Sequence, residues 1–369
     1  MIFLVKAVIA VLNFIFLCMK VLPVKNKITY ISRQSNSKSE DMTLLEIAIK
    51  DIAPEIRQVF LCKKLDGGIM NKAWYCFHIL SQMYHIATSK AVILDSYCIS
   101  ISALNQRESL LVIQMWHALG SLKKFGFSIV GSGEGRDQSV AEAFSMHRNY
   151  TYILTSGKAC KMHFAEAFGY HEDSIKVMSL PRVDKLRDEN VRRETVERIH
   201  IEYPEFAGKN VVVYAPTFRK DKDISQEISR LSRCFDKEEY AFVLKKHPLM
   251  ETHEIDGIVD DKFTTIEMMY AADYVICDYS AVIFEAAVMG KPLFFYAFDY
   301  DSYGVDRDFY IDYKNEMPGK ISSDPEEIAE AIRLDDYNKK EIIAFGRKYV
   351  EQQENCSGKL AEFVVGKMY

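Results

Sequence analysis

The sequence of 369 residues predicts an α/β protein with two doubly wound parallel-sheet domains and a cleft between them. Short apolar runs, typical of buried parallel strands, alternate with stretches long enough to form crossover helices. This alternation breaks at Pro181 and at the highly charged segment 184–202, and it starts again at residue 211. A chain of this length can also supply two domains with a core each.

Apolar runs mark the predicted strands of both domains. In the first domain, predicted to span residues 28–181, they cover residues 28–31, 59–62, 91–94, 110–114, 152–154 and 177–180. In the second domain, predicted to span residues 182–369, they cover residues 211–214, 242–245, 274–277 and 293–296. Stretches such as 72–86 and 158–168 have the length of crossover helices, and residues 325–353 read as a polar helical tail.

Residues 1–27 form a separate hydrophobic and basic segment. Its apolar stretch covers residues 7–19, is interrupted only by Asn13 and is bounded by Lys6 and Lys20. It is short for a membrane span, which needs roughly 20 residues, and no small residues mark a secretory cleavage site. We expect a helix that lies on an anionic membrane surface, on the cytoplasmic face under the positive-inside rule. A spanning helix and an ordinary core helix stay open as alternatives.

The charge of the chain is uneven. Its net charge of −5 divides into +6 for residues 1–39, which contain no acidic residue, and −11 for the rest. Basic residues near an anionic lipid leaflet favour association with it, by about 1 kcal/mol each. The acidic body lacks the broad basic face that general nucleic-acid binding needs, so no nucleic-acid partner is expected.

The eight cysteines are scattered and include no C-x-x-C pair, unlike a disulfide framework or a zinc site. We expect free thiols in a reducing cytosol. The loop at 131–136, GSGEGR, has Arg136 where the dinucleotide-binding fingerprint has its third glycine, and the chain has no phosphate-loop, G-x-S-x-G or H-E-x-x-H motif. No metal or cofactor is predicted.

Polar clusters follow one predicted strand in each domain. His117 comes directly after the strand at 110–114 and suits a general base, with Lys123 and Lys124 in the following predicted helix to hold an anion. A capping histidine is the alternative. After the strand at 211–214, Thr217 can donate a hydroxyl and Arg219 can grip a phosphate with two hydrogen bonds. An N-cap and a solvated cation are the alternatives there.

Two further clusters lie in the second predicted domain. Lys245, Lys246 and His247 follow the strand at 242–245, and a lone histidine there would usually be structural. However, His117 and His247 end strands in different domains, so both can face one cleft. The fourth cluster follows the strand at 274–277.

In this fourth cluster, Asp278 ends the strand and a helix is predicted from Ser280 to Gly290. Ser280 can be an ordinary N-cap. Alternatively, the helix start and the Ser280 hydroxyl take a diphosphate, and Glu285 accepts from a ribose hydroxyl. Open α/β sheets bind nucleotides at this edge.

Taken in order, the four clusters make the chain similar to the CDP-glycerol glycerophosphotransferase family, which builds teichoic-acid and related polyol-phosphate polymers. The similarity covers about residues 28–320. It is carried by a Trp-His strand end, Ala-Pro-Thr-Phe-Arg, Lys-x-His-Pro and Asp-Tyr-Ser-x-x-x-Phe-Glu. It implies a GT-B-like fold, an active site between the two domains and no required metal.

The resemblance also implies roles for single residues. His117 would be the base and His247 the second catalytic histidine of the cleft. Phosphate contacts would come from Arg182, Thr217 and Arg219, and Ser280 and Glu285 would hold CDP. The full set of substrate-binding or CDP-binding positions that we expect is Ala118, Leu119, Gly120, Ser121, Arg182, Pro216, Thr217, Arg219, Lys245, Lys246, Asp278, Ser280, Ala281 and Glu285.

Three positions depart from the family's pattern. The family's His-Gly-Thr-Pro is His117-Ala118-Leu119-Gly120 in this chain. The second serine of the usual pair is Ala281, which removes one hydroxyl, and Glu285 stands where aspartate is common. Donor or acceptor preference is expected to differ at these positions.

The expected reaction is transfer of glycerol phosphate, or a related polyol phosphate, from a CDP-activated donor to a hydroxyl of a lipid-linked saccharide acceptor, with release of CMP. Two alternatives stay open: a sugar-nucleotide glycosyltransferase of the same two-domain type, and a membrane adaptor without catalysis. Glycerol against ribitol, wall polymer against capsule, and the oligomeric state are left open. A single catalytic unit favours the addition of one or a few polyol phosphates over polymerisation.

Overall fold

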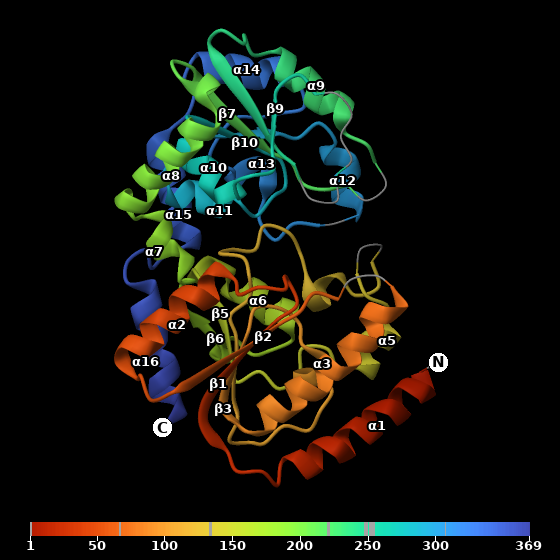
Figure 1. Cartoon of the computed structure of the whole chain (residues 1–369). Helices are drawn as coiled ribbons and strands as arrows, with labels where there is room; N and C mark the ends of the chain where they lie inside the picture. The colour runs from red at the N-terminus through yellow and green to blue at the C-terminus, as the bar shows by residue number, and fades with distance from the viewer. Residues whose placement is uncertain are drawn as a thin grey trace. The chain divides into compact units, whose positions relative to one another are not determined.

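A computed structural model describes residues 2–65, 68–132, 135–219, 222–246, 250, 255–306 and 308–369 of the chain (Figure 1). It divides into two compact units. The first unit contains residues 1–118, 125–184 and 354–369, and the second contains residues 119–124 and 185–353.

The first unit contains a parallel sheet of six strands in the order β2-β1-β3-β4-β5-β6. The strands are β1 (Lys25–Ser32), β2 (Arg57–Cys62), β3 (Ser89–Leu94), β4 (Leu111–Gln114), β5 (Tyr152–Thr155) and β6 (Ile175–Val177). The three strands β1, β3 and β4 are buried along most of their length, as expected for a sheet covered on both faces.

The helices of the first unit connect these strands and cover the sheet. They are α1 (Ile2–Met19), α2 (Glu40–Ile52), α3 (Ile69–Ala87), α4 (Ile99–Ser102), α5 (Gln138–Ala143), α6 (Lys161–Phe168) and α16 (Cys356–Met368), with 3₁₀ turns at Gly126–Ile129, Lys158–Cys160 and Glu172–Ser174. Helix α7 (Arg182–Leu186) begins in the first unit and ends in the second. Figure 1 shows α2 and α16 side by side and α1 along the outside of α3, and contacts between each pair agree with the view.

The second unit repeats this plan with a parallel sheet in the order β12-β11-β10-β7-β8-β9. Its strands are β7 (Asn210–Ala215), β8 (Tyr240–Lys245), β9 (Ile258–Asp260), β10 (Tyr274–Cys277), β11 (Leu293–Tyr296) and β12 (Ile321–Ser322). Its helices are α8 (Glu189–Glu202), α9 (Ser225–Arg233), α10 (Thr265–Ala271), α11 (Ile283–Val288), α12 (Tyr300–Asp306), α13 (Tyr313–Glu316), α14 (Pro325–Arg333) and α15 (Lys339–Tyr349), with a 3₁₀ turn at Pro204–Phe206.

The core of the second unit shows why its strands are apolar throughout. Helices α9 and α14 pack through Ile228 and Ile332 onto one face of the sheet, which presents Tyr214, Ile276 and Phe294. Figure 1 shows α8, α10, α11 and α15 grouped together in this unit, and α10 contacts β7 while α11 contacts β11. Because both faces of the sheet are covered, the strands have no polar face, and periodicity alone could not distinguish them from buried helix.

Several elements differ from the sequence prediction. The two short strands β9 and β12 were not predicted, since neither is an apolar run. The strand predicted at 177–180 is observed as β6, which begins two residues and ends three residues earlier, because its partner β5 ends at Thr155 and leaves nothing to pair with residues after 178. No helix follows His117: residues 118–125 are an irregular segment before the 3₁₀ turn at Gly126–Ile129.

The chain is also divided differently from the expected boundary at residue 181. Helix α16 packs in the first unit, although the sequence assigned it to the second. It contacts α2 and β3, and its apolar face is buried there through Leu360 and Val364. Its first backbone N–H groups, those of Cys356 and Ser357, donate to the Asp184 carboxylate.

Helix α1 is longer than the apolar stretch that predicted it and is anchored on the first unit along one side. Phe16 is fully buried, and Asn13 donates to the Ala103 carbonyl and accepts from the Asn105 N–H. The opposite side exposes large apolar residues, with Phe3 87%, Phe14 68% and Leu17 59% exposed. In the part of the chain that the structure describes, no helix combines the length and apolarity that a membrane crossing requires.

Candidate active site

Each sheet has one position where the chain order of its strands reverses, and open α/β sheets bind ligands beyond the carboxyl ends of the strands at this position. In the first unit it lies between β1 and β3, and in the second between β7 and β10. The polar residues that end these strands are Ser32 and Asp95 in the first unit, and Thr217 and Asp278 in the second. Two of the four clusters found in the sequence, those of Thr217 and Asp278, therefore lie at the reversal point of the second sheet.

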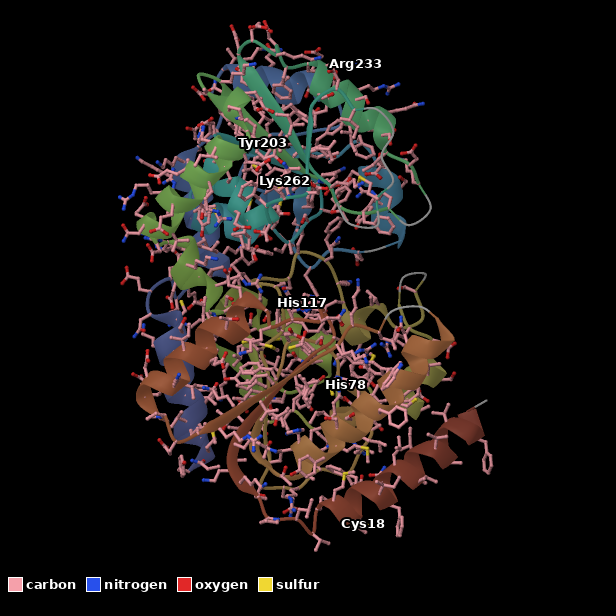
Figure 2. The ribbon with its side chains drawn as sticks, viewed as in Figure 1. Cys18, His78, His117, Tyr203, Arg233 and Lys262 are labelled. Carbon is pink, nitrogen blue, oxygen red and sulfur yellow. The ribbon has the colours of Figure 1, made fainter. Side chains whose placement is uncertain are left out.

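His117 lies beyond the strand ends of the first unit (Figure 2). Its Nδ1 is 2.9 Å from the backbone carbonyl oxygen of Asp95, and the side-chain amide nitrogen of Gln34 lies 3.1 Å from the same Nδ1. A carbonyl oxygen can only accept, so Nδ1 carries the proton in the Asp95 contact and Nε2 keeps its lone pair. The ring therefore presents a basic nitrogen.

The protein around His117 adjusts its basicity. Desolvation lowers the pKa of His117, and the hydrogen bond to the Asp95 carbonyl opposes this shift in part. The residue nevertheless remains solvent-accessible. A neutral ring at neutral pH is the form that can take up a proton.

The backbone next to His117 is strained. Trp116 has a φ of 63°, in the left-handed region that a bulky residue rarely adopts. Its ring stacks on Phe125 and packs against His117, at centroid distances of 5.0 and 4.2 Å. Strain of this kind persists where the surroundings enforce it, and it is common at functional sites.

Arg182 holds the His117 segment from the other side. Its backbone N–H and its Nε donate to the two carboxylate oxygens of Asp41, at 2.8 and 2.9 Å, and its Nη2 is 2.6 Å from the same carboxylate. Nη2 also donates to the backbone carbonyl of His117 at 2.9 Å. The contacts of Arg182 thus position His117, whereas the sequence suggested a contact with phosphate.

In the second unit, the carboxylate of Asp278 organises the loop that follows β7. It is completely buried and accepts hydrogen bonds from the backbone N–H and the hydroxyl of Thr217, at 2.8 and 2.7 Å, and from the Tyr279 N–H at 2.5 Å. Asp278 and the buried Pro216 therefore shape the site from behind and are not exposed to a ligand as the sequence suggested. Thr217 is half-buried at its edge.

Arg219 forms a buried ion-pair network. Its guanidinium makes two parallel hydrogen bonds of 3.0 Å to Asp299 and lies 3.0 Å from Asp278. The rings of Tyr279 and Tyr303 lie 5.1 and 4.5 Å from it. Burial alone would raise the pKa of Asp299, but the hydrogen bonds and charge of Arg219 hold it below its usual value. In this structure the charge of Arg219 is paired with Asp278 and Asp299, and its expected contact with phosphate stays a prediction.

Lys245 is also part of an internal ion pair. Its ammonium is buried and contacts the Asp260 carboxylate at 2.5 Å and the Phe263 carbonyl. Tyr203 donates to the same carboxylate at 2.6 Å, and Figure 2 labels Tyr203 together with Lys262, whose backbone N–H is a further donor to Asp260. Lys245 therefore does not face a ligand. Its neighbour Lys246 is half-buried. His247, predicted as the second catalytic histidine, lies outside the described residues.

The segment after β10 keeps some of its expected features. Helix α11 begins at Ile283 with Val282 as its N-cap, so the Ser280 hydroxyl is not the helix cap; it accepts weakly from the Val282 N–H at 3.4 Å. Ser280 and Ala281 are half-buried and lie beside the reversal point, whereas Glu285 is buried in the first turn of α11. At six residues, α11 is too short to supply a diphosphate site by its dipole alone.

The four expected positions after His117 do not form a single binding loop. Ala118 is half-buried in the first unit, whereas Leu119, Gly120 and Ser121 are buried in the second unit. Leu119 is fully buried, so it packs in a core and does not contact a substrate.

Comparison with known proteins identifies the family. The model of the CDP-glycerol:poly(glycerophosphate) glycerophosphotransferase family matches residues 13–366. The chain belongs to this family. Its members' reaction class is the transfer of a polyol phosphate from a CDP-activated donor, and this enzyme is a transferase of that class.

Individual relatives support the same assignment. The chain is 33% identical over 325 residues to a teichoic acid ribitol-phosphate primase of Bacillus spizizenii, covering 84% of each chain. It is 27% identical over 300 residues to a teichoic acid glycerol-phosphate primase of Bacillus subtilis, covering 78% of this chain and 76% of that protein. A poly(ribitol-phosphate) polymerase of B. spizizenii is 32% identical, but the match covers only 48% of its length.

Solved structures support the fold. The wall teichoic acid polymerase TagF matches with a TM-score of 0.76 and 19% identity, over 98% of this chain and 97% of that chain. A UDP-GlcNAc 2-epimerase from Neisseria meningitidis matches with a TM-score of 0.59 and 10% identity, over 92% and 100% of the two chains. The two parallel six-stranded sheets of the chain therefore have the GT-B-like fold that the sequence predicted.

Sequence reasoning missed three carboxylates of this site. Asp95 directly follows the strand predicted at 91–94, so the strand-end rule that found His117 could have found it. Asp41 and Asp299, the partners of Arg182 and Arg219, had no such signal. They are recognisable only once the fold brings them to arginines 141 and 80 residues away.

The carboxyl of Asp95 is unusual among the described residues of the site. It is buried, and neither of its oxygens has a hydrogen-bond partner there. Burial raises the pKa of Asp95 to about 6, against the effect of the nearby Ser32 and Ser96 hydroxyls. Its backbone carbonyl, which orients His117, is its best-defined contribution to the site.

Proposed function

We propose that this enzyme transfers glycerol phosphate, or a related polyol phosphate, from a CDP-activated donor to a hydroxyl of a lipid-linked acceptor in teichoic-acid-type synthesis. The observation that carries the proposal is the geometry of His117. Its Nδ1 is fixed on the Asp95 carbonyl, and its Nε2 is left as a base at the reversal point of the first sheet. Family membership supplies the donor class.

In the proposed reaction, His117 acts as the general base. Nε2 of His117 removes the proton of the acceptor hydroxyl while its oxygen attacks the β-phosphorus of the donor. A bond forms between that oxygen and the β-phosphorus, the bond from the β-phosphorus to the bridging oxygen breaks, and CMP leaves. Our candidates for donor contacts are Thr217 and Ser280, which lie at the reversal point of the second sheet, and Lys246, which follows the neighbouring strand β8; Asp278 fixes Thr217. His247 stays a candidate for stabilising the transferred phosphoryl group.

Replacement of His117 by alanine tests the assignment. A positioned general base contributes roughly 10²–10⁴-fold, so we expect His117→Ala to lower the rate of CMP release from CDP-glycerol and a lipid-linked disaccharide analogue by that factor. Because the pKa of His117 is lowered, kcat/KM of the wild type should be constant around neutral pH. It should decrease only when the pH falls below the usual pKa of a histidine, where the ring becomes protonated. This acid limb should be absent in the variant.

His171→Ala is the matched control, because His171 is exposed and forms its ion pair with Asp173, two residues further along the chain. Near-normal CMP release by His117→Ala would contradict its role as the base. The donor class is tested separately by thermal protection: CDP-polyols should raise the melting temperature and UDP-sugars should not. Protection by UDP-sugars alone would indicate a glycosyltransferase. Mass spectrometry of product made from equal CDP-glycerol and CDP-ribitol identifies the transferred polyol.

We further propose that the enzyme is held at the cytoplasmic face of the membrane by α1, which would bring it to a lipid-linked acceptor. Phe3, Phe14 and Leu17 are exposed and fall on one side of the helix, opposite the buried Phe16. The helix contains no acidic residue and is followed by Lys20 and Lys25. An exposed apolar face with basic flanks is the pattern of a helix that lies in a membrane interface.

Vesicle sedimentation measures this association. Wild-type enzyme should pellet with vesicles that contain anionic lipid, and less so at high salt, because surface charge interactions are screened. Replacing Phe3, Phe14 and Leu17 together by serine should abolish pelleting. Ile201→Ser, which changes an exposed apolar residue of α8, should leave it unchanged. Equal pelleting of the triple variant would exclude α1 as the contact.

A further inference from the structure

The six residues that follow His117 and Ala118 form a strap, Leu119–Lys124, that packs in the second unit before the chain returns to the first at Phe125. Main-chain hydrogen bonds hold its far end: the Lys124 N–H donates to the Asp308 carbonyl and the Tyr310 N–H to the Leu122 carbonyl, at 2.9 and 3.0 Å. Leu119 and Leu122 are fully buried. The strap is therefore an integral part of the second unit.

Gly120 is the point of closest packing in the strap. A Cβ at this position would lie 2.6 Å from the end of the Phe284 ring, a distance that real Cβ atoms do not adopt. The φ of Gly120 is outside the left-handed region, so the obstacle to a side chain is contact and not backbone conformation. Phe284 is fully buried and stacks on Phe345, so its ring has little room to move aside.

We propose that Gly120 and Phe284 are positioning residues: their contact fixes the strap in the second unit, and the short chain from His117 to Gly120 limits how far the proposed base can lie from the strap. Gly120 follows His117 by three residues, and Phe284, which it contacts, directly precedes Glu285. Three extended residues span at most about 11 Å, so the chain itself limits the distance between the Cα atoms of His117 and Gly120. The inference rests on the proposed function of His117.

Enzyme kinetics with a rescue variant test the proposal. Gly120→Ala should lower kcat for CMP release about 100-fold, the effect of misplacing a reacting group by about 1 Å, while CDP affinity stays within about threefold. Leucine at 284 removes the ring atoms that the new Cβ would meet. The double variant with Gly120→Ala and Phe284→Leu should therefore recover most of the lost kcat, measured against Phe284→Leu alone. Gly366→Ala is the matched control, because a Cβ there meets no atom within 4 Å.

Amide hydrogen exchange supplies a readout that does not depend on activity. In Gly120→Ala, the amides of Lys124 and Tyr310, which hold the strap, should exchange about tenfold faster than in the wild type. If wild-type enzyme releases no CMP from any CDP-polyol, the proposed function is wrong. Amide hydrogen exchange alone then tests the contact between Gly120 and Phe284. Unchanged exchange, or a kcat that Phe284→Leu does not rescue, would overturn the proposal.

Discussion

At the scale of single residues, the same residue type after a strand serves two different purposes. Lys245 and Lys246 are adjacent, yet only the first enters a buried ion pair, with Asp260. Arg219 likewise neutralises Asp278 and Asp299. A buried charge requires a partner, and the fold rather than the local sequence determines whether that partner is a carboxylate or a ligand.

Replacing Lys245 by methionine distinguishes the two roles. The change leaves the Asp260 carboxylate buried without its cation, which costs about 3–5 kcal/mol in the free energy of unfolding. Urea denaturation at neutral pH measures this loss. Lys246→Met, at the half-buried neighbouring position, is the control and should change the free energy of unfolding by less than about 0.5 kcal/mol. If Lys245→Met instead weakened CDP binding and left stability intact, Lys245 would be a ligand-binding residue.

At the scale of elements, the sequence predicted the apolar strands well and the polar connections poorly. Every predicted strand overlaps an observed one, because strands covered on both faces are apolar throughout. The edge strands β9 and β12 are only three and two residues long and lack that signal. The helix expected after His117 is replaced by the strap, whose buried leucines gave a helix-like pattern although they pack in the second unit.

The candidate site was predictable to the same extent. The rule that polar residues at strand ends form sites placed Thr217 and Asp278 at the reversal point of the second sheet and His117 beside Asp95, which follows β3 at the reversal point of the first. It could not show that Asp278 is turned inward to bind Thr217, since this depends on the pairing of β7 with β10. The order of strands in a sheet is a property of the whole chain, and one sequence does not contain it locally.

At the scale of the whole molecule, the chain passes between the two units four times: at residues 118–119, 124–125, 184–185 and 353–354. Neither unit is therefore a continuous stretch of sequence. The strap belongs to the second unit although the first surrounds it in sequence, and α16 completes the first unit after the whole second unit has been made. A continuous boundary, such as the one expected at residue 181, cannot describe this division.

The place of α16 leads to a stability prediction with a convenient probe. Both tryptophans, Trp74 and Trp116, lie in the first unit, so tryptophan fluorescence reports on the unfolding of that unit. Leu360→Ala removes a fully buried side chain of α16 and should lower the free energy of unfolding followed by fluorescence by about 2–5 kcal/mol, through lost burial and the cavity left behind. Leu334→Ala, at a residue 70% exposed in the second unit, is the control and should change it by less than about 0.5 kcal/mol. An unchanged fluorescence transition in Leu360→Ala would mean that the first unit folds without α16, and the division of the chain described above would then be incorrect.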